Sequence, residues 1–337
     1  MSFRRWLVGL LLVGFMTATS NAEDQWVVYK SSGKGVGVGK HIVLVSGDDE
    51  YRSEEALPML GKILAKRHGF KCTVLFAINP KTGDIQPNFQ TNIPGLEALK
   101  SADLMIMALR FRGLPDKQMK HIVDYMNSGK PIIGLRTSTH AFNMRGKSSY
   151  KHLSWNSRSK GWLGGFGRQV LGDTWINHHG HHGRESTRGI INQKYAKHPI
   201  LRGVKDIWGP TDVYGVRHLV KEANVLVHGQ VVAGMKPSDP PVDGRKNDPM
   251  MPLIWTKTFK GSEGKESRIF CTTMGASTDF QSEGLRRTVV NASLWCLGME
   301  KKIPAKSNVD YVGKYKPTKF GFGSFTRGVK PEDHKLD

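Results

Sequence analysis

Cysteine is scarce in this sequence, and its scarcity excludes two classes of protein. The chain has three cysteines, Cys72, Cys271 and Cys296, among 337 residues. So few thiols cannot form the dense disulfide framework of a small secreted domain, and none has the Cys-x-x-Cys spacing of a structural zinc site. Each lies in an apolar run, so we expect buried core thiols, and the odd number leaves at least one unpaired.

Long apolar runs are also lacking, apart from one near the N-terminus. Arg4 and Arg5 precede an apolar stretch at 6–15, and small polar residues follow as far as Ala22. The stretch is shorter than the roughly 20 residues that span a bilayer, and the pattern is typical of a secretory signal peptide at 1–22. We therefore expect a periplasmic or extracellular protein with no stable membrane span. A tethered N-terminus is the alternative.

Acidic residues are few relative to basic ones. The chain has 50 Lys and Arg against 29 Asp and Glu, and its formal net charge is +21. Such a charge is suited to binding nucleic acid. Export, however, would separate the protein from cytosolic nucleic acid. In addition, no basic run is interleaved with the aromatic residues that stack on single strands. Anionic glycans, lipid headgroups or solubility account for the charge, and we expect no nucleic-acid partner.

Strand-like and helix-like segments alternate after a Gly-rich segment at 23–40, which we expect to be a flexible leader. Apolar runs predict strands at 41–46, 72–77, 104–108 and 131–135, and apolar residues at helical spacing predict helices at 54–68 and 117–127. Further strands are predicted at 174–177, 225–231, 253–256 and 269–273, with a closing helix at 286–297. Fully apolar strands between amphipathic helices predict an α/β fold, with a doubly wound, mostly parallel sheet and helices on both faces. One domain would span 41–300, and 301–337 would be an extended basic tail that wraps the domain or serves as a partner arm.

Polar residues follow three of these strands at the point where each ends. Ligands of open parallel sheets bind beyond the carboxyl ends of the strands, so these residues are the candidate site. They are Asp48, Asp49, Glu50 and Tyr51 after the first strand, Arg110 and Arg112 after the third, and Arg136, Ser138 and His140 after the fourth. The arginines would bind an anionic or hydroxyl-rich ligand, and Asp49, Glu50 or His140 would move protons. Solvated loops are the alternative for any single residue.

Four histidines lie within the segment 178–182. Neutral imidazoles suit zinc or another divalent transition metal, but adjacent residues of a strand face opposite sides, so the four cannot share one ion. His179 with His181, or His178 with His182, could share a side. A metal site on His179 and His181, hydrogen bonding of a substrate by His181 and His182, and a basic surface loop all remain open.

These segments together resemble the ThuA-like (trehalose utilisation) family, which has the class I glutamine amidotransferase-like fold, a flavodoxin-like doubly wound sheet. The resemblance spans about 41–299. It rests on the order of HIVLVSGDDEYRSEE, ADLMIMALRFR, GKPIIGLRTSTHAF, WLGGFGRQVLG, KHPIL, TDVY, PLIWTKTF, RIFCTTMG and SLWCLG. It implies carbohydrate metabolism, and it adds Asp212 and Tyr214 to the residues expected to bind substrate.

The chain departs from the family pattern at two places. Amidotransferases have Cys and ThuA-like chains often have His at the turn after the fourth strand, where this chain has Arg136, and Ala276 replaces the usual His after Gly275. Arginine is no nucleophile, so a glutaminase reaction is excluded. We expect a secreted protein that binds a disaccharide or sugar acid and transforms it as a hydrolase or isomerase. The alternatives are a non-catalytic module for anionic polysaccharide or a protein partner, and a metal-dependent hydrolase that uses the histidines of 178–182.

Overall fold

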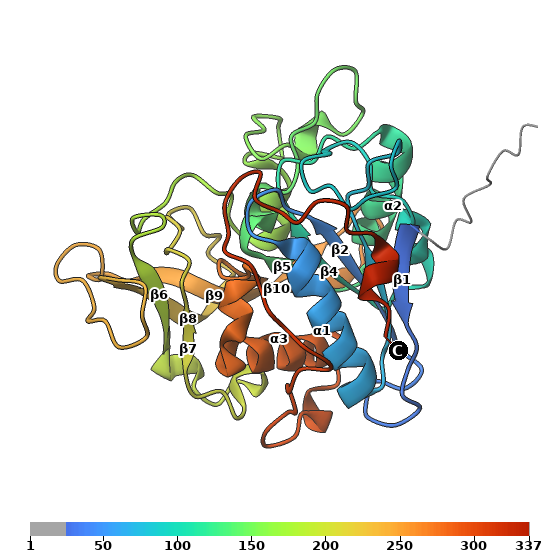
Figure 1. The fold of residues 1–337 in the computed structure, drawn as a ribbon. Helices are drawn as coiled ribbons and strands as arrows, with labels where there is room; N and C mark the ends of the chain where they lie inside the picture. Colours follow the sequence, from blue (N-terminus) through green and yellow to red (C-terminus); the bar gives the residue numbers. More distant parts are fainter. Residues whose placement is uncertain (1–24, 337) are drawn as a thin grey trace, which may run out of the picture.

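The computed structural model describes residues 25–336 (Figure 1). The expected signal peptide at 1–22 lies outside the described residues, so export stays a prediction. Among the described helices, none combines the length and the apolar character that crossing a bilayer requires.

One ten-stranded mixed sheet runs through the molecule, in the order β1-β3-β2-β4-β5-β10-β9-β8-β6-β7. The strands are β1 Trp26–Tyr29, β2 His41–Gly47, β3 Lys71–Leu75, β4 Leu104–Leu109, β5 Ile132–Leu135, β6 Ser186–Ile191, β7 Ile207–Gly209, β8 Asn224–Val232, β9 Met251–Lys260 and β10 Glu266–Thr272. The strands β3, β2, β4, β5 and β10 pair in parallel, whereas β10, β9, β8, β6 and β7 pair in antiparallel. Strands β9 and β10 are antiparallel because the loop between them is long enough for a hairpin and too short for a crossover helix.

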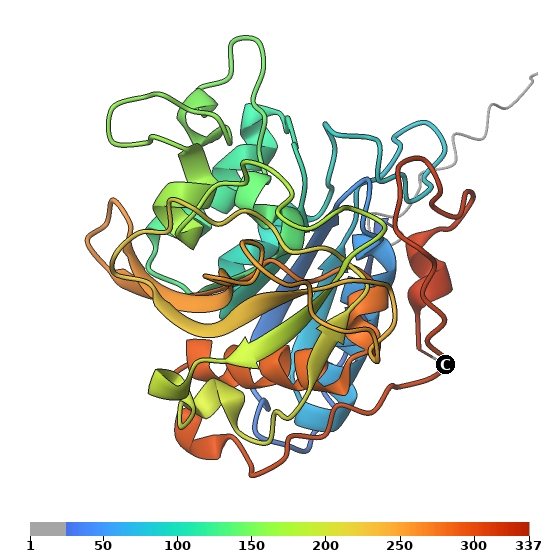
Figure 2. The ribbon, with the colours of Figure 1, turned by 90° about the vertical axis from the view of Figure 1, so that its left-hand side faces the viewer.

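The helices α1 Ser53–His68, α2 Asp116–Asn127 and α3 Glu283–Cys296 cover the parallel half of the sheet from both sides (Figures 1 and 2). Successive residues of β2 face opposite sides. Ile42 and Leu44 pack in the core that α1 and α3 close, and Val43 and Val45 pack in the core that α2 closes. The α/β class is therefore confirmed, and the doubly wound arrangement holds for the parallel half only.

Two predicted segments differ from the structure. The expected flexible leader contains β1, which pairs antiparallel with β3 and buries Val27 and Tyr29 in the core. The expected strand at 174–177 is irregular chain instead, and only the next residue, His178, makes an isolated bridge to Tyr214. The three cysteines are free and buried, as expected.

The tail at 301–337 wraps the domain as far as the structure describes it. It runs beside α1 and then along the end of the sheet that carries β1 (Figure 1). The Arg67 guanidinium donates to the Tyr311 carbonyl at 3.1 Å, the Ile85 amide donates to the Val329 carbonyl at 2.8 Å, and the Tyr29 hydroxyl donates to the His334 carbonyl at 2.8 Å. These contacts hold the tail against the sheet, so its residues belong to the domain surface.

Candidate functional site

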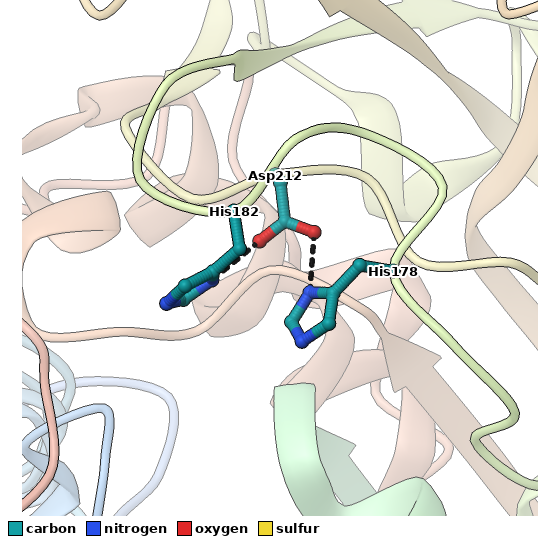
Figure 3. Close-up of side chains that lie close together, drawn as sticks. All are labelled: His178, His182 and Asp212. Atoms are coloured by element: carbon teal, nitrogen blue, oxygen red, sulfur yellow. Dashed lines mark hydrogen bonds and ion pairs between the residues drawn. The ribbon is translucent and has the colours of Figure 1, made fainter.

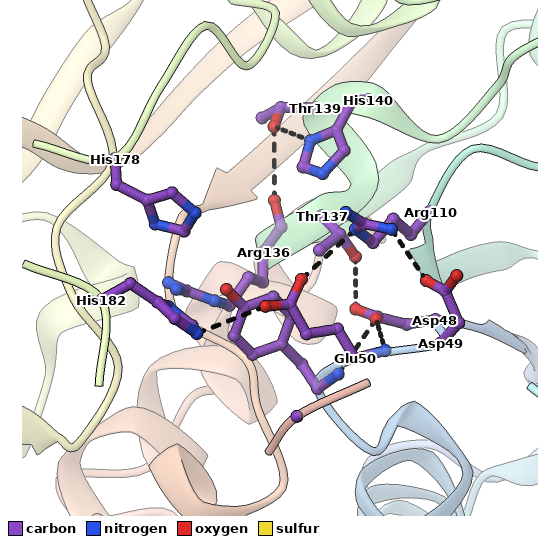
Figure 4. A network of polar contacts seen from close by, with 12 residues as sticks. Asp48, Asp49, Glu50, Arg110, Arg136, Thr137, Thr139, His140, His178 and His182 are labelled. Atoms are coloured by element: carbon purple, nitrogen blue, oxygen red, sulfur yellow. Dashed lines mark hydrogen bonds and ion pairs between the residues drawn. The ribbon is translucent and has the colours of Figure 1, made fainter. Parts of the chain in front are cut away.

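The loops that follow β2, β4 and β5 meet at one edge of the sheet, as the sequence predicts. Figure 4 shows carboxylates from the first loop, Arg110 from the second, and the segment 136–140 from the third lying together. The segment 178–182 and Asp212 reach the same place from the antiparallel half of the sheet. The site therefore lies where the parallel and antiparallel halves of the sheet meet.

Arg136 occupies the sharp turn after β5 and forms the floor of the site. Its backbone has a left-handed φ of 39°, and it begins a short 3₁₀ segment, Arg136–His140. Its guanidinium donates to the Asp212 carboxylate at 3.1 Å and to the Thr273 carbonyl at 2.6 Å. The rings of Tyr51 and Tyr214 lie on it, each 4.2 Å from the guanidinium carbon. Since Arg136 is only 1% exposed, it is a buried cation that holds Asp212 rather than a group that reaches a ligand.

Asp212 holds two imidazoles in place (Figure 3). His178 Nδ1 lies 2.6 Å from Asp212 Oδ2, and His182 Nδ1 lies 3.0 Å from Asp212 Oδ1. Burial opposes ionisation of this carboxyl, but the two histidine hydrogen bonds and the charge of Arg136 outweigh burial and hold its pKa well below its ordinary value. An ionised carboxylate only accepts hydrogen bonds, so both Nδ1 atoms carry protons. Each imidazole therefore turns its Nε2 atom away from Asp212.

Glu50 completes this group at the Nε2 side of His182. Its Oε1 lies 3.4 Å from His182 Nε2, and its Oε2 lies 3.4 Å from Arg110 Nε. Burial, together with the nearby charge of Asp48, raises the pKa of Glu50 above its ordinary value, although Arg110, Arg136 and His182 oppose the shift. A carboxyl whose pKa is raised retains a proton more readily, so Glu50 is suited to donate one.

The other acidic residues of the first loop organise the backbone and Arg110. Asp48 accepts hydrogen bonds from the Thr137 hydroxyl at 2.5 Å and from the amide of Glu50 at 2.8 Å. Burial raises the pKa of Asp48 despite these bonds. Asp49 forms an ion pair with Arg110 at 3.1 Å. Both carboxylates are therefore occupied, and Glu50 is the acid of this loop that faces the histidines.

His140 lies behind the reactive groups. It is 2% exposed, and burial together with the charges of Arg110 and Arg136 lowers its pKa well below the ordinary value. The rings of Phe111 and Trp175 pack on it with centroids at 4.8 and 5.1 Å. A neutral, covered imidazole cannot exchange protons with a ligand, so the role expected for His140 in proton transfer gives way to packing.

The sequence itself identifies the family of this site. A sequence model of the ThuA family, described as trehalose utilisation, matches residues 42–296. The chain belongs to the ThuA family. Membership implies a role in trehalose utilisation, and the resemblance seen in the sequence is confirmed.

Several solved structures resemble the chain. A ThuA-like protein of Bacteroides uniformis is 13% identical with a TM-score of 0.48, covering 78% of this chain and 93% of its own. A ThuA-like protein of Parabacteroides merdae is also 13% identical with a TM-score of 0.48, covering 88% and 99%. A cytoplasmic protein of Salmonella typhimurium is 14% identical with a TM-score of 0.39, covering 78% and 100%. No curated protein matches the sequence.

Four residues predicted for this ThuA-family site are engaged by other partners or are largely exposed. The Ser138 hydroxyl donates to the Met107 carbonyl, and the Arg112 guanidinium, which is fully buried, donates to the carbonyls of Arg110, Pro87 and Phe89. Both residues fix backbone rather than bind a ligand. His179 Nε2 contacts the Lys246 carbonyl at 2.8 Å, and His181 lies beside Glu185 with a side chain that is 71% exposed. His179 and His181, one of the pairings considered for a metal, do not belong to the described group of close potential ligands.

The alternative pairing, His178 with His182, is the one that the fold brings together. With Asp212 these residues form a group whose potential ligand atoms all lie within 4.8 Å of one another. Imidazole Nε2 atoms whose Nδ1–H groups are held by a carboxylate are typical zinc ligands. The group could therefore hold a divalent transition metal.

Sequence reasoning missed the aromatic surroundings of the site. Trp175 packs on His178 with ring centroids 5.8 Å apart, and Phe320 of the tail packs on His182 at 5.3 Å. Neither residue follows a strand of the parallel sheet, so the rule that located the other residues could not find them. A hollow of about 740 Å³ lies elsewhere, beside the start of α3. Among its charged lining residues, Glu283 pairs with Arg287 and Lys306, and Asp206 pairs with Arg188.

Proposed function

We propose that this protein is an exported enzyme that isomerises a sugar by moving protons between His178, Glu50 and the substrate. The observation that carries the proposal is the Asp212 carboxylate between two imidazoles, with Glu50 on the outer side of His182 at 3.4 Å. Membership of the ThuA family supports a sugar as the substrate.

The chemistry follows from the orientation of these groups. His178 Nε2 takes the proton from the carbon beside a sugar carbonyl, and the electron pair of that C–H bond becomes the C=C bond of an enediol. The protonated Glu50 gives its proton to the carbonyl oxygen, whose C=O bond becomes C–OH. Loss of the neighbouring hydroxyl proton to Glu50 and return of the first proton from His178 to the other carbon then give the isomer. No further reactant is needed.

A glycosidase with two acting carboxylates fits the site less well. Such enzymes need one carboxyl as acid and a second as base or nucleophile. Both oxygens of Asp212 are engaged by imidazoles and by Arg136, and Asp49 is paired with Arg110. Glu50 is the carboxyl of this described group that lies beside Nε2 of an imidazole and has a raised pKa, so one acid–base carboxyl is available rather than two, which favours isomerisation over glycoside hydrolysis.

Exchange of substrate hydrogen with solvent tests the proposal directly. The protein is incubated in D₂O with reducing sugars and keto-sugars, and NMR detects deuterium beside the carbonyl. Both His178→Gln and Glu50→Gln should slow exchange by about 10²-fold or more, the range for loss of a positioned acid or base. His181→Gln is the matched control, because that side chain is 71% exposed. Equal exchange rates in all variants would contradict the proposal, and so would the absence of exchange with every sugar tested.

A metal-dependent hydrolase is the second candidate, supported by the closeness of His178, His182 and Asp212. Asp212 would orient the imidazoles, and a bound zinc ion would activate water. Metal analysis of protein purified without a histidine tag separates the two proposals. One zinc per chain that is lost in His178→Ala would favour the hydrolase, and protein free of metal that still exchanges substrate hydrogen would favour the isomerase.

Export is part of the proposal and rests on the sequence at 1–22. The basic start and short apolar stretch predict cleavage after Ala22, and an exported protein would meet its sugar outside the cytoplasm. N-terminal sequencing of the protein from its native host should begin at residue 23. Recovery of the uncleaved chain from the cytoplasm would contradict this part.

A further inference from the structure

The C-terminal segment 318–324 lies directly against the proposed acid–base group. The Gly321 amide donates to the Glu50 carbonyl at 2.8 Å, and the Arg52 guanidinium donates to the Gly321 carbonyl at 2.6 Å and to the Ser324 hydroxyl. Arg52 is fully buried and has a left-handed φ of 60°. A buried cation in an uncommon backbone conformation thus ties the tail to the loop that carries Glu50.

Two phenylalanines of this segment contact residues of the site. The Phe320 ring, 7% exposed, packs between Tyr51 at 5.5 Å and His182 at 5.3 Å, measured between ring centroids. The Phe322 ring lies 4.7 Å from the Arg110 guanidinium carbon and is 62% exposed. Phe320 therefore covers one side of His182, whereas Phe322 has Arg110 against one face of its ring and is otherwise largely exposed.

Aromatic rings from the tail and from other loops surround the reactive groups. From His178 the contacts continue through Trp175 at 5.8 Å, Trp155 at 6.2 Å and Phe111 at 5.6 Å, and Phe111 in turn packs on Arg110 at 4.7 Å. These separations lie in the range of direct ring packing. In the tail, Phe322 contacts Arg110 and Phe320, two residues earlier, contacts His182. An aromatic wall with a few convergent polar groups is the usual composition of a small-molecule site.

We propose that residues 318–324 form one wall of the ligand site and that the sugar ring packs on Phe322. This inference rests on the proposed function. The C–H face of a sugar is apolar and suits a flat aromatic ring, while Arg110 and Glu50 beside it can bind the hydroxyl groups. The match to the ThuA family ends at residue 296, so this wall is contributed by residues outside the matched region.

Substitutions of Phe322 test the wall without disturbing the fold, because this side chain is largely exposed. Isothermal titration of the chain with trehalose, glucose and glucuronate measures the affinity of each variant. Phe322→Ala and Phe322→Leu should weaken binding of the best sugar by roughly 10-fold, which corresponds to about 1.4 kcal/mol. Phe322→Trp, which keeps a flat ring, should bind like the unaltered protein. Lys319→Ala, an exposed residue of the same segment, is the control and should change nothing.

The outcomes separate this inference from the proposed function. If the unaltered protein binds none of the three sugars, the sugar site fails and the wall fails with it. If it binds a sugar and Phe322→Ala binds equally well, the wall alone is overturned and the proposed function stands. Equal affinity of Phe322→Leu and the unaltered protein would also overturn it, because packing on a flat ring would then contribute nothing.

Discussion

Asp212→Asn is the substitution that tests the organisation of the site most directly. The change removes the charge that balances Arg136, and both side chains of that pair are at most 1% exposed. It also replaces one carboxylate oxygen by an amide nitrogen, which cannot accept the Nδ1–H of whichever histidine it faces. That imidazole must then change tautomer or turn away.

The expected cost is large because the remaining cation is buried. Breaking a buried ion pair by removing one partner costs about 3–5 kcal/mol, and the lost histidine hydrogen bond adds about 1 kcal/mol. The two carbonyls and two tyrosine rings around Arg136 keep the loss near the lower end. We expect Asp212→Asn to lower the free energy of unfolding by about 3–4 kcal/mol at pH 7.

Urea unfolding measures the interaction energy between Asp212 and Arg136. It compares the single variants Asp212→Asn and Arg136→Met with the double variant. The double variant should lose less than the sum of the single losses, because neither charge is then left unpaired. The folded pKa of Asp212 lies below its unfolded value, so its stabilisation is complete above roughly pH 4 and is lost as pH falls through the folded pKa. A loss below about 1 kcal/mol, or additive losses, would refute the reasoning.

Three further predictions concern buried titratable groups. Burial raises the pKa of Glu54 to about 8, so the folded state retains a proton that the unfolded state releases. In urea titrations the protein should therefore lose stability relative to Glu54→Gln as pH rises from 5 to 9. A stability difference that does not change with pH would contradict this. Burial lowers the pKa of His140. The protein should therefore lose stability relative to His140→Gln as pH falls below the unfolded pKa of about 6.5. Parallel profiles of unfolding free energy against pH for the two proteins would contradict this. Burial raises the pKa of all three cysteine thiols, so a thiol reagent should label the native protein slowly and should label three thiols after denaturation; rapid native labelling would show that a thiol is accessible.

Local pattern was enough to predict the parallel half of the sheet and the place of the site. The mostly apolar runs that become β2, β4 and β5 are buried at every position, because both faces of a parallel sheet are covered. Topology then dictates that the residues after these strands meet at one edge. For this reason Glu50, Arg110 and Arg136 were expected together, and the structure brings them together.

The structure places several of these residues in surroundings that this reasoning did not predict. Arg136 was expected to bind a ligand, but it binds Asp212, which lies 76 residues away in the chain. His140 was expected to move protons, but aromatic rings from two other loops cover it. Burial decides between these roles, and burial depends on segments that pack from elsewhere in the chain.

Sequence by itself thus determined the α/β class, the family and the sharp turn at Arg136, because strand and helix periodicity and the turn after β5 are local properties. Tertiary structure alone decided which histidines act together, since His178 and His182 are selected by Asp212, 34 and 30 residues further along the chain. It also decided that β1 joins the sheet and that Phe320 and Phe322 reach the site. Side chains on irregular loops have no period to reveal their direction, so only the partners that the fold brings to them determine where they point.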